Sequence, residues 1–166
     1  MDVLILLGSE SDLDVGRAAC KIFDEMKVGY ELKIASAHRS PERVKELVRG
    51  AESEGASVII AGAGLSAHLA GVVAAETLLP VIGVPMGGGP LNGMDSLLST
   101  VNMPGGVPVA TVSVGKAGGT NAALLACRIL ALSDKDLAAR LASYRDKMAR
   151  EVEKADNRVQ KELGKA

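Results

Sequence analysis

The chain has 166 residues, a formal net charge of -1, 48% hydrophobic residues and 23% charged residues, a composition typical of one soluble globular domain. The near-zero net charge argues against a nucleic-acid scaffold, which needs a surplus of basic residues on one face. Aromatic residues make up only 2% of the chain, so the usual stacking platforms for single-stranded nucleic acid are missing.

The sequence also argues against a membrane-bound or exported protein. No window approaches the ~20 apolar residues of a membrane span. The N-terminus lacks a basic region, and its apolar run at residues 3–7 is too short for a signal peptide. Cys20 and Cys127 lie far apart in helix-like patterns, which indicates buried thiols in a reducing compartment rather than a disulfide framework or a zinc site. We therefore expect a cytoplasmic protein without a membrane partner.

Short apolar runs alternate with helical periodicity along most of the chain. Strands are predicted at residues 2–7, 30–34, 57–61, 81–84 and 107–112. Helices are predicted at residues 12–26, from Pro41 onward, and at 69–78, 95–101 and 120–132. Ser11 is expected to cap the first helix and Ser40 the second. Such alternation predicts an α/β fold in which helices cover both faces of a parallel sheet.

Ligands of parallel α/β sheets bind outside the carboxyl ends of the strands. The predicted order of elements therefore places the candidate site in five loops, at residues 8–12, 35–40, 62–68, 85–94 and 113–119.

The loop at residues 8–12 reads GSESD and leads into the first predicted helix. Backbone N–H groups at such a helix start can hold a phosphate, and Asp12 could accept hydrogen bonds from sugar hydroxyls. The loop matches neither the dinucleotide-binding glycine motif nor a Walker A loop. An ordinary capped turn explains it equally well.

The next loop reads SAHRSP at residues 36–41. Histidine exchanges protons near neutral pH, which suits His38 to acid–base catalysis. Arg39 beside it could bind a phosphate through its planar guanidinium. A surface histidine in a loop is the alternative, and the position after a strand together with the adjacent arginine favours function.

The third loop reads GAGLSAHL at residues 62–69. Gly62 and Gly64 would let the backbone approach a ligand closely. His68 is expected at a helix start, where the helix dipole disfavours its charged form. We prefer to interpret His68 as a neutral hydrogen-bonding residue, with a second catalytic role as the alternative.

The remaining glycine-rich loops are less specific. Residues 86–93 form either a mobile lid or a plain flexible linker. The GKAGGT run at residues 115–120 only superficially suggests a P-loop, because Ala117 follows Lys116 and Ala110 occupies the place of the first motif glycine. We reject a nucleoside triphosphatase. No cluster of metal-ligating residues and no GxSxG elbow occurs in the sequence.

The segment at residues 134–163 differs from the rest in its dense mixed charge. Its apolar residues recur at Leu137, Leu141, Tyr144, Met148, Val152, Ala155, Val159 and Leu163. This spacing keeps one stripe along a long helix, with Ser133 as its expected cap. A helix of about 30 residues would be roughly 45 Å long, more than the width of such a domain. We expect an α/β catalytic domain at 1–133 and a helical arm at 134–166 that packs on a neighbouring subunit; a solvated tail beyond Asn157 is the alternative.

Seven segments together resemble a known family. They are GSESD at 8–12, SAHRSPE at 36–42, AGAGLSAHLAG at 61–71, GVP at 83–85, LNGMDSL at 91–97, MPGGVPV at 103–109 and NAALLA at 121–126. In this order they closely resemble the family of N5-carboxyaminoimidazole ribonucleotide mutases, also called the catalytic subunit of phosphoribosylaminoimidazole carboxylase. The resemblance covers roughly residues 2–160.

The resemblance implies a three-layer α/β/α sandwich with a parallel, flavodoxin- or Rossmann-like sheet and a long C-terminal helix. It implies a cytoplasmic homo-octamer of purine (IMP) biosynthesis whose active sites lie at subunit boundaries. It also implies a phosphoribosyl aminoimidazole substrate, no nucleic-acid partner, and no metal or organic cofactor.

The implied reaction moves a carboxylate within the aminoimidazole ribonucleotide. The carbamate on the exocyclic nitrogen is lost as carbon dioxide in a closed pocket, and the imidazole ring carbon then attacks it. His38 matches the family's acid–base histidine, which would protonate the nitrogen and take the proton from the ring carbon. Ser9, Asp12 and Arg39 match substrate-binding positions. Chemistry suggests Arg39 and the turn with Ser9 and Ser11 for the phosphate, and Asp12 for the ribose.

The backbone at residues 62–64 would line the pocket for the imidazole and carbon dioxide, and the loops at 87–93 and 103–106 would gate it. The expected substrate-binding residues are Gly8, Ser9, Ser11, Asp12, Ser36, Arg39, Gly62, Gly64 and His68.

The family has two classes, and the alternative to a mutase is a carboxylase that uses free carbon dioxide. Arg39 and the AGAG pattern at residues 61–64 resemble the mutase class, whereas the GGGP run at 87–90 departs from many mutases. A ligand sensor or assembly module without catalysis is the rival outside enzymes.

Overall fold

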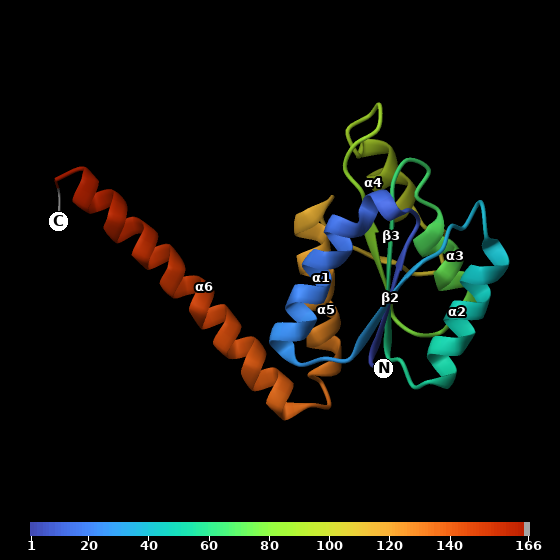
Figure 1. Cartoon of the computed structure of the whole chain (residues 1–166), viewed down its shortest axis with the longest axis horizontal. Coiled ribbons are helices and arrows are strands. Elements are labelled where there is room, and N and C mark those ends of the chain that lie inside the picture. Colours follow the sequence, from blue (N-terminus) through green and yellow to red (C-terminus); the bar gives the residue numbers. More distant parts are fainter. Residues whose placement is uncertain (165–166) are drawn as a thin grey trace. The chain divides into compact units, whose positions relative to one another are not determined.

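The computed structural model describes residues 1–164 (Figure 1). These residues belong to two compact units, which divide between Ile129 and Leu130. The last two residues of the predicted arm at 134–166 lie outside the described part of the chain. Within residues 1–164, no helix combines the length and apolar character that a membrane crossing requires.

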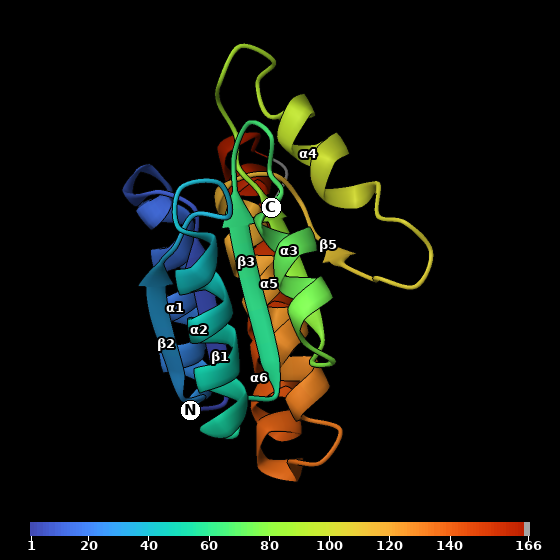
Figure 2. The same cartoon turned by 90° about the vertical axis from the view of Figure 1, so that its right-hand side faces the viewer.

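The first unit is built on one parallel sheet (Figure 2). Its strands are β1 (Val3–Leu7), β2 (Tyr30–Ile34), β3 (Val58–Ala63), β4 (Val81–Pro85) and β5 (Ala110–Thr111). They pair in the order β2-β1-β3-β4-β5, and every pair is parallel. The parallel sheet predicted from the sequence is confirmed.

A helix follows each strand along the chain, and a further helix is the last element of the chain's described part. The helical elements are a 3-10 turn, η1 (Glu10–Asp12), followed by α1 (Leu13–Met26), α2 (Pro41–Ser53), α3 (Leu69–Glu76), α4 (Met94–Val101), α5 (Lys116–Leu130) and α6 (Lys135–Glu162). Helices α1 and α5 cover one face of the sheet, and α2 and α3 cover the other (Figure 1). This arrangement is the expected three-layer α/β/α sandwich.

The core explains why the central strands are apolar at every position. All five residues of β1 and of β4 are buried, because helices cover both sheet faces. On the face of α2 and α3, Leu4 and Leu6 of β1 belong to one buried cluster with Val44 and Val48 of α2. The strand ends, and with them the loops of the candidate site, are therefore held by a continuous apolar core.

The fifth strand is shorter than predicted. Residues 107–112 were expected to form it, but only Ala110 and Thr111 pair with β4. Pro108 has no N–H group, so it cannot donate to the ladder.

One of the two serine caps predicted for the first two helices is wrong. Ser9, not Ser11, caps the first turn: its Oγ accepts a hydrogen bond from Ser11 N at 3.3 Å. Ser40 occupies the cap position of α2 and Pro41 begins the helix, as predicted. The Ser40 hydroxyl makes no bond to the helix, because its Oγ accepts from Ser36 N and donates to Ser36 O instead.

Helix α5 begins at Lys116, whereas the sequence predicted a start at about Thr120. Residues 116–119 (KAGG) thus belong to the helix. A Cβ atom on Gly119 would meet the backbone oxygen of Val15 in α1, so the missing side chain allows the two helices to approach closely.

The second unit contains α6, which runs for 28 residues. Asp134, rather than the predicted Ser133, caps it, since its Oδ1 accepts from Leu137 N at 2.9 Å. Along the predicted stripe, Met148, Val152 and Val159 are 49%, 70% and 49% exposed. The long helix is confirmed; Leu137 at its start is buried, and the three exposed residues leave the later part of the apolar stripe open to solvent.

Candidate active site

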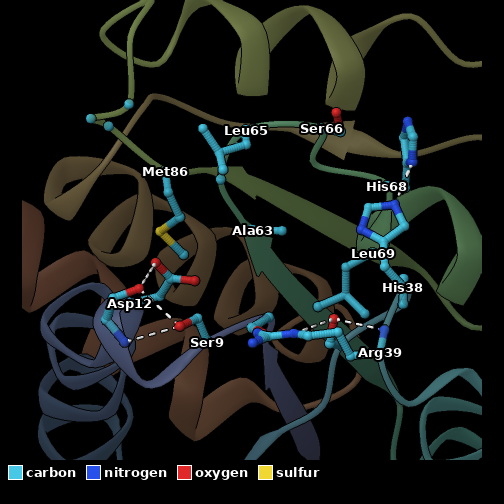
Figure 3. Close-up of a pocket in the computed structure, with 18 residues that line it drawn as sticks. Ser9, Asp12, His38, Arg39, Ala63, Leu65, Ser66, His68, Leu69 and Met86 are labelled. Atoms are coloured by element: carbon cyan, nitrogen blue, oxygen red, sulfur yellow. Dashed lines mark hydrogen bonds between the residues drawn. The ribbon is translucent and has the colours of Figure 1, made fainter.

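A cavity of about 710 Å³ lies at the carboxyl ends of β1 to β4 (Figure 3). It is lined by the loops that follow these four strands, so four of the five loops singled out in the sequence contribute to it. The lining residues are Gly8, Ser9, Ser11, Asp12, Ser36, Ala37, His38, Arg39, Ala63, Gly64, Leu65, Ser66, His68, Leu69, Met86, Gly87, Gly88 and Gly89. The fifth loop, at residues 113–119, does not line this cavity.

Nine of the ten site residues expected from the sequence line this cavity. The exception is Gly62, which lies inside β3. A Cβ atom there would collide with the side chain of Met86 and come within 3.1 Å of Leu7. The absent side chain at Gly62 therefore makes room for packing behind the cavity.

Sequence reasoning missed several residues of the cavity wall. Leu69 and Met86 resemble core residues by their apolar character, and both are indeed largely buried. Only their positions could have pointed to them, since Leu69 directly follows the loop at 62–68 and Met86 lies within the loop at 85–94. Residues 87–89, which the sequence left open as lid or linker, line the cavity as well.

The loop after β1 places hydroxyl and carboxylate groups together. Ser9 Oγ lies 3.0 Å from Ser11 Oγ, and Ser11 Oγ lies 3.3 Å from Asp12 Oδ1. Partial burial raises the pKa of Asp12 above its usual 3.8, because desolvation disfavours the carboxylate; hydrogen bonds from Ser11 and Ser9 partly oppose this. The loop therefore offers both donors and an acceptor to a ligand.

Arg39 connects the loop after β2 to the end of β1. Its Nη2 donates to Gly8 O at 3.1 Å, and its backbone N–H donates to Ser36 Oγ at 3.2 Å. Ser36 is itself held by Ser40 Oγ, which accepts from Ser36 N at 3.0 Å. These bonds place the guanidinium beside Ser9 (Figure 3).

The structure brings the two histidines of the chain together. His38 Nε2 lies 2.8 Å from His68 Nδ1, and the two rings meet nearly edge to face at 76°. One nitrogen must donate and the other accept, so the tautomers of the two rings are linked. A proton at this contact can be shared between the rings. The neutral role of His68 remains a prediction.

The two kinds of groups lie at different sides of the cavity. Figure 3 shows Ser9 and Asp12 on one side and the pair of His38 and His68 on the other. The cavity thus carries hydroxyl and carboxylate groups on one side and two imidazole rings on the other. Among the described residues, no group of three or more His, Cys, Asp or Glu side chains could hold a metal ion.

Comparisons with known proteins show which family this chain resembles. Residues 2–151 match the family described as AIR carboxylase. A Bacillus subtilis protein named N5-carboxyaminoimidazole ribonucleotide mutase is 56% identical over 142 residues, which cover 86% of this chain and 88% of that protein. A Schizosaccharomyces pombe protein named phosphoribosylaminoimidazole carboxylase is 55% identical over 153 residues, which cover 92% of this chain but 27% of that protein.

A solved structure shows the same fold. The crystal structure of Treponema denticola PurE superposes with a TM-score of 0.86 at 30% sequence identity, covering 95% of this chain and 98% of that one. The family match extends over most of the chain, and the relatives are similar along nearly all of it. The chain belongs to the AIR carboxylase family.

Proposed function

We propose that this chain is an N5-carboxyaminoimidazole ribonucleotide mutase, the activity for which its relative in Bacillus subtilis is named. The observation that carries the proposal is the contact between His38 and His68 inside a cavity whose other side holds Ser9, Asp12 and Arg39. A ribonucleotide fits this arrangement, because it carries a phosphate at one end and a reactive base at the other.

Substrate binding uses the side of the cavity away from the histidines. The guanidinium of Arg39 and the turn with Ser9 and Ser11 bind the phosphate. Asp12 accepts hydrogen bonds from the ribose hydroxyls. Gly8 O and Ser36 Oγ accept hydrogen bonds from Arg39 and hold it in place. This orientation directs the imidazole toward Gly64 and His68.

The reaction then needs one proton carrier. The N–CO₂⁻ bond of the carbamate breaks, carbon dioxide forms, and His38 delivers a proton to the exocyclic nitrogen. The ring carbon attacks the trapped carbon dioxide, and the same imidazole removes the proton from that carbon. The proton count balances, because His38 gives one proton and recovers one. His68 shares the proton through the 2.8 Å contact and keeps the His38 ring oriented.

Carbon dioxide must stay in the cavity between the two steps. The loops at residues 87–93 and 103–106 close the site in this proposal. Gly88 and Gly89 suit such a loop, since they adopt φ values of 105° and 67°, which glycine takes without strain.

The working form in this proposal is a cytoplasmic homo-octamer with active sites at subunit boundaries. Residues 134–166 form the arm that packs on a neighbouring subunit, which the exposed apolar stripe of α6 supports. A second apolar stripe supports assembly through the first unit: Leu91, Met94, Leu98 and Val101 follow helical spacing on and before α4 and are 49–60% exposed.

A carboxylase that uses free carbon dioxide is the second candidate. The relative in Schizosaccharomyces pombe carries the carboxylase name, and so does the family description. Arg39 after the histidine and the AGAG run at residues 61–64 favour the mutase class.

Two substrate feeds distinguish these functions. The purified protein receives the carbamate ribonucleotide in buffer depleted of carbon dioxide, or aminoimidazole ribonucleotide with abundant bicarbonate. We expect fast formation of carboxyaminoimidazole ribonucleotide only from the first. Fast turnover only from the second would establish a carboxylase, and activity with neither would favour a ligand-binding module.

A further inference from the structure

One segment contributes more of the cavity wall than any other. Residues 63–69 supply six lining residues, and the only member that does not line the cavity is Ala67. Ala67 is 1% exposed and lies between Ser66 and His68, both of which line the cavity. The position of Ala67 therefore determines where both of these side chains point.

The middle of this segment is not held by regular structure. Residues 64–68 lie between the end of β3 at Ala63 and the start of α3 at Leu69. Leu65 adopts φ 54°, a left-handed conformation that is unfavourable for a side chain with a Cβ atom. Such a turn persists only when surrounding contacts hold it in place.

The contact that holds it comes from α4. Ser99 Oγ accepts a hydrogen bond from Ala67 N at 3.0 Å. Leu65 O also lies 2.9 Å from that N–H group, so the amide is shared between a local and a distant acceptor. The Ser99 hydroxyl donates to Asp95 O at 2.7 Å, with Leu65 O at 3.3 Å and Ser96 O at 3.3 Å as longer alternatives.

The same helix also holds a second loop of the cavity. Ser96 Oγ donates to Met86 O at 2.6 Å, and Met86 lines the cavity directly before residues 87–89. Helix α4 itself contributes no residue to the cavity wall. Its contribution is indirect: the hydroxyl groups of Ser96 and Ser99 bind the main chain of two loops that line the cavity.

We propose that Ser99 is a positioning residue for catalysis: its hydroxyl fixes the turn at residues 65–67 and thereby holds His68 at hydrogen-bond distance from His38. The inference rests on the proposed function for its kinetic consequence. Its structural part, the tether between Ser99 and Ala67, is independent of the substrate.

The test uses three substitutions with graded chemistry. Ser99→Ala removes the acceptor and leaves a strong helix former on a half-buried position, so the fold should persist. Ser99→Cys keeps the size but offers only a weak acceptor, and Ser99→Thr retains the hydroxyl. The matched control is Ser53→Ala in α2, whose hydroxyl makes the same bond to the carbonyl four residues earlier (Arg49 O, 2.9 Å) but lies away from the cavity.

We expect kcat to fall about tenfold or more in Ser99→Ala and Ser99→Cys, because small displacements of reacting groups cost rate steeply. KM should change less than about threefold, since the phosphate and ribose side is untouched. Ser99→Thr should recover most of kcat, and Ser53→Ala should leave it unchanged. In amide hydrogen exchange, Ala67 N–H should exchange faster in Ser99→Ala, while β1 and β3 keep their protection.

A kcat within about twofold of the parent in Ser99→Ala, or no recovery in Ser99→Thr, would overturn the proposal. So would a kcat loss in Ser53→Ala of equal size, because the effect would then follow helix stability alone. If the parent protein turns over neither substrate feed, the proposed function fails and the exchange experiment decides the tether: unchanged exchange at Ala67 would overturn it, and faster exchange would support it.

Discussion

Helices α2 and α6 both carry apolar residues at helical spacing, but the two apolar stripes differ in their exposure to solvent. In α2, Val44, Val48 and Ala51 recur at helical spacing and are at most 2% exposed, because they pack on the sheet. In α6, Val152 and Val159 also recur at helical spacing, yet they are 70% and 49% exposed. An apolar stripe thus predicts a helix equally well in both units, but it does not say what will cover the stripe.

The difference separates two tasks within one chain. The first unit buries the apolar residues that pack on its sheet and presents polar ones at the strand ends, where they line a cavity. Helix α6 has dense charge, an Asp134 cap and an open apolar stripe, which suits contact with another chain. Substitutions at the cavity should therefore change turnover, and substitutions on the stripe of α6 should change assembly.

The largest effect is expected at the cavity. Replacing His38 with Asn should lower kcat by roughly 10²- to 10⁴-fold, the usual contribution of a positioned acid or base. Asn keeps a polar side chain but carries no titratable proton. Ligand binding, followed by calorimetry with the product nucleotide, and the size of the assembly, followed by light scattering, should persist. Unchanged turnover would eliminate His38 as the proton carrier.

Substitutions in α6 should change the assembly. The double substitution Val152→Asp and Val159→Asp places charge on the apolar stripe, and we expect a smaller or less stable assembly in light scattering. Deleting residues 155–166 should act in the same direction. Lys154→Asp with Asn157→Asp, on the opposite helix face, is the matched control and should leave the assembly intact. A stable monomer for the unaltered protein would refute the arm.

The smallest effect concerns Asp12 and pH. Its pKa is raised in the folded state, so between 3.8 and that raised value the folded protein binds more protons than the unfolded one. Stability attributable to Asp12 therefore falls as pH rises through this window. Asp12→Asn should melt at the same or a slightly higher temperature at pH 7, with a higher KM for the ribonucleotide.

The advantage of Asp12→Asn in melting temperature should shrink as pH falls through the window, because Asp12 becomes neutral in both states. Thermal melting between pH 3 and pH 7 measures this. A variant that is less stable at pH 7 and recovers at low pH would show that the Asp12 carboxylate stabilises the fold.

Much of the site could be predicted before the structure, because parallel sheets bring the loops after their strands to one edge. This rule placed Ser9, Asp12, His38 and Arg39 together correctly. The rule failed for Gly62, where the missing side chain serves packing. It also overlooked Leu69 and Met86, since an apolar residue that faces a cavity has the same sequence signature as one that faces the core.

Local errors have a common origin. Ser11 and Ser133 are not the caps, and Ser40 occupies the cap position without bonding the helix, because a serine hydroxyl can bind either the helix or the loop before it, and neighbouring residues decide which. The predicted start of α5 is too late because the helix includes Gly118 and Gly119, of which Gly119 lies close to Val15 of α1. Propensity alone places glycine outside helices.

The sequence by itself determined the alternation of strands and helices, the loops that carry the polar side chains, and the long final helix, because periodicity and turn chemistry act over a few residues. Only the tertiary structure decided the contacts that make a site of these loops. His38 meets His68 from 30 residues away, and Ala67 meets Ser99 from 32 residues away. Such hydrogen bonds depend on which strand lies beside which, and here β3 lies between β1 and β4. Strand order is set by the packing of the whole sheet, so no local pattern specifies it.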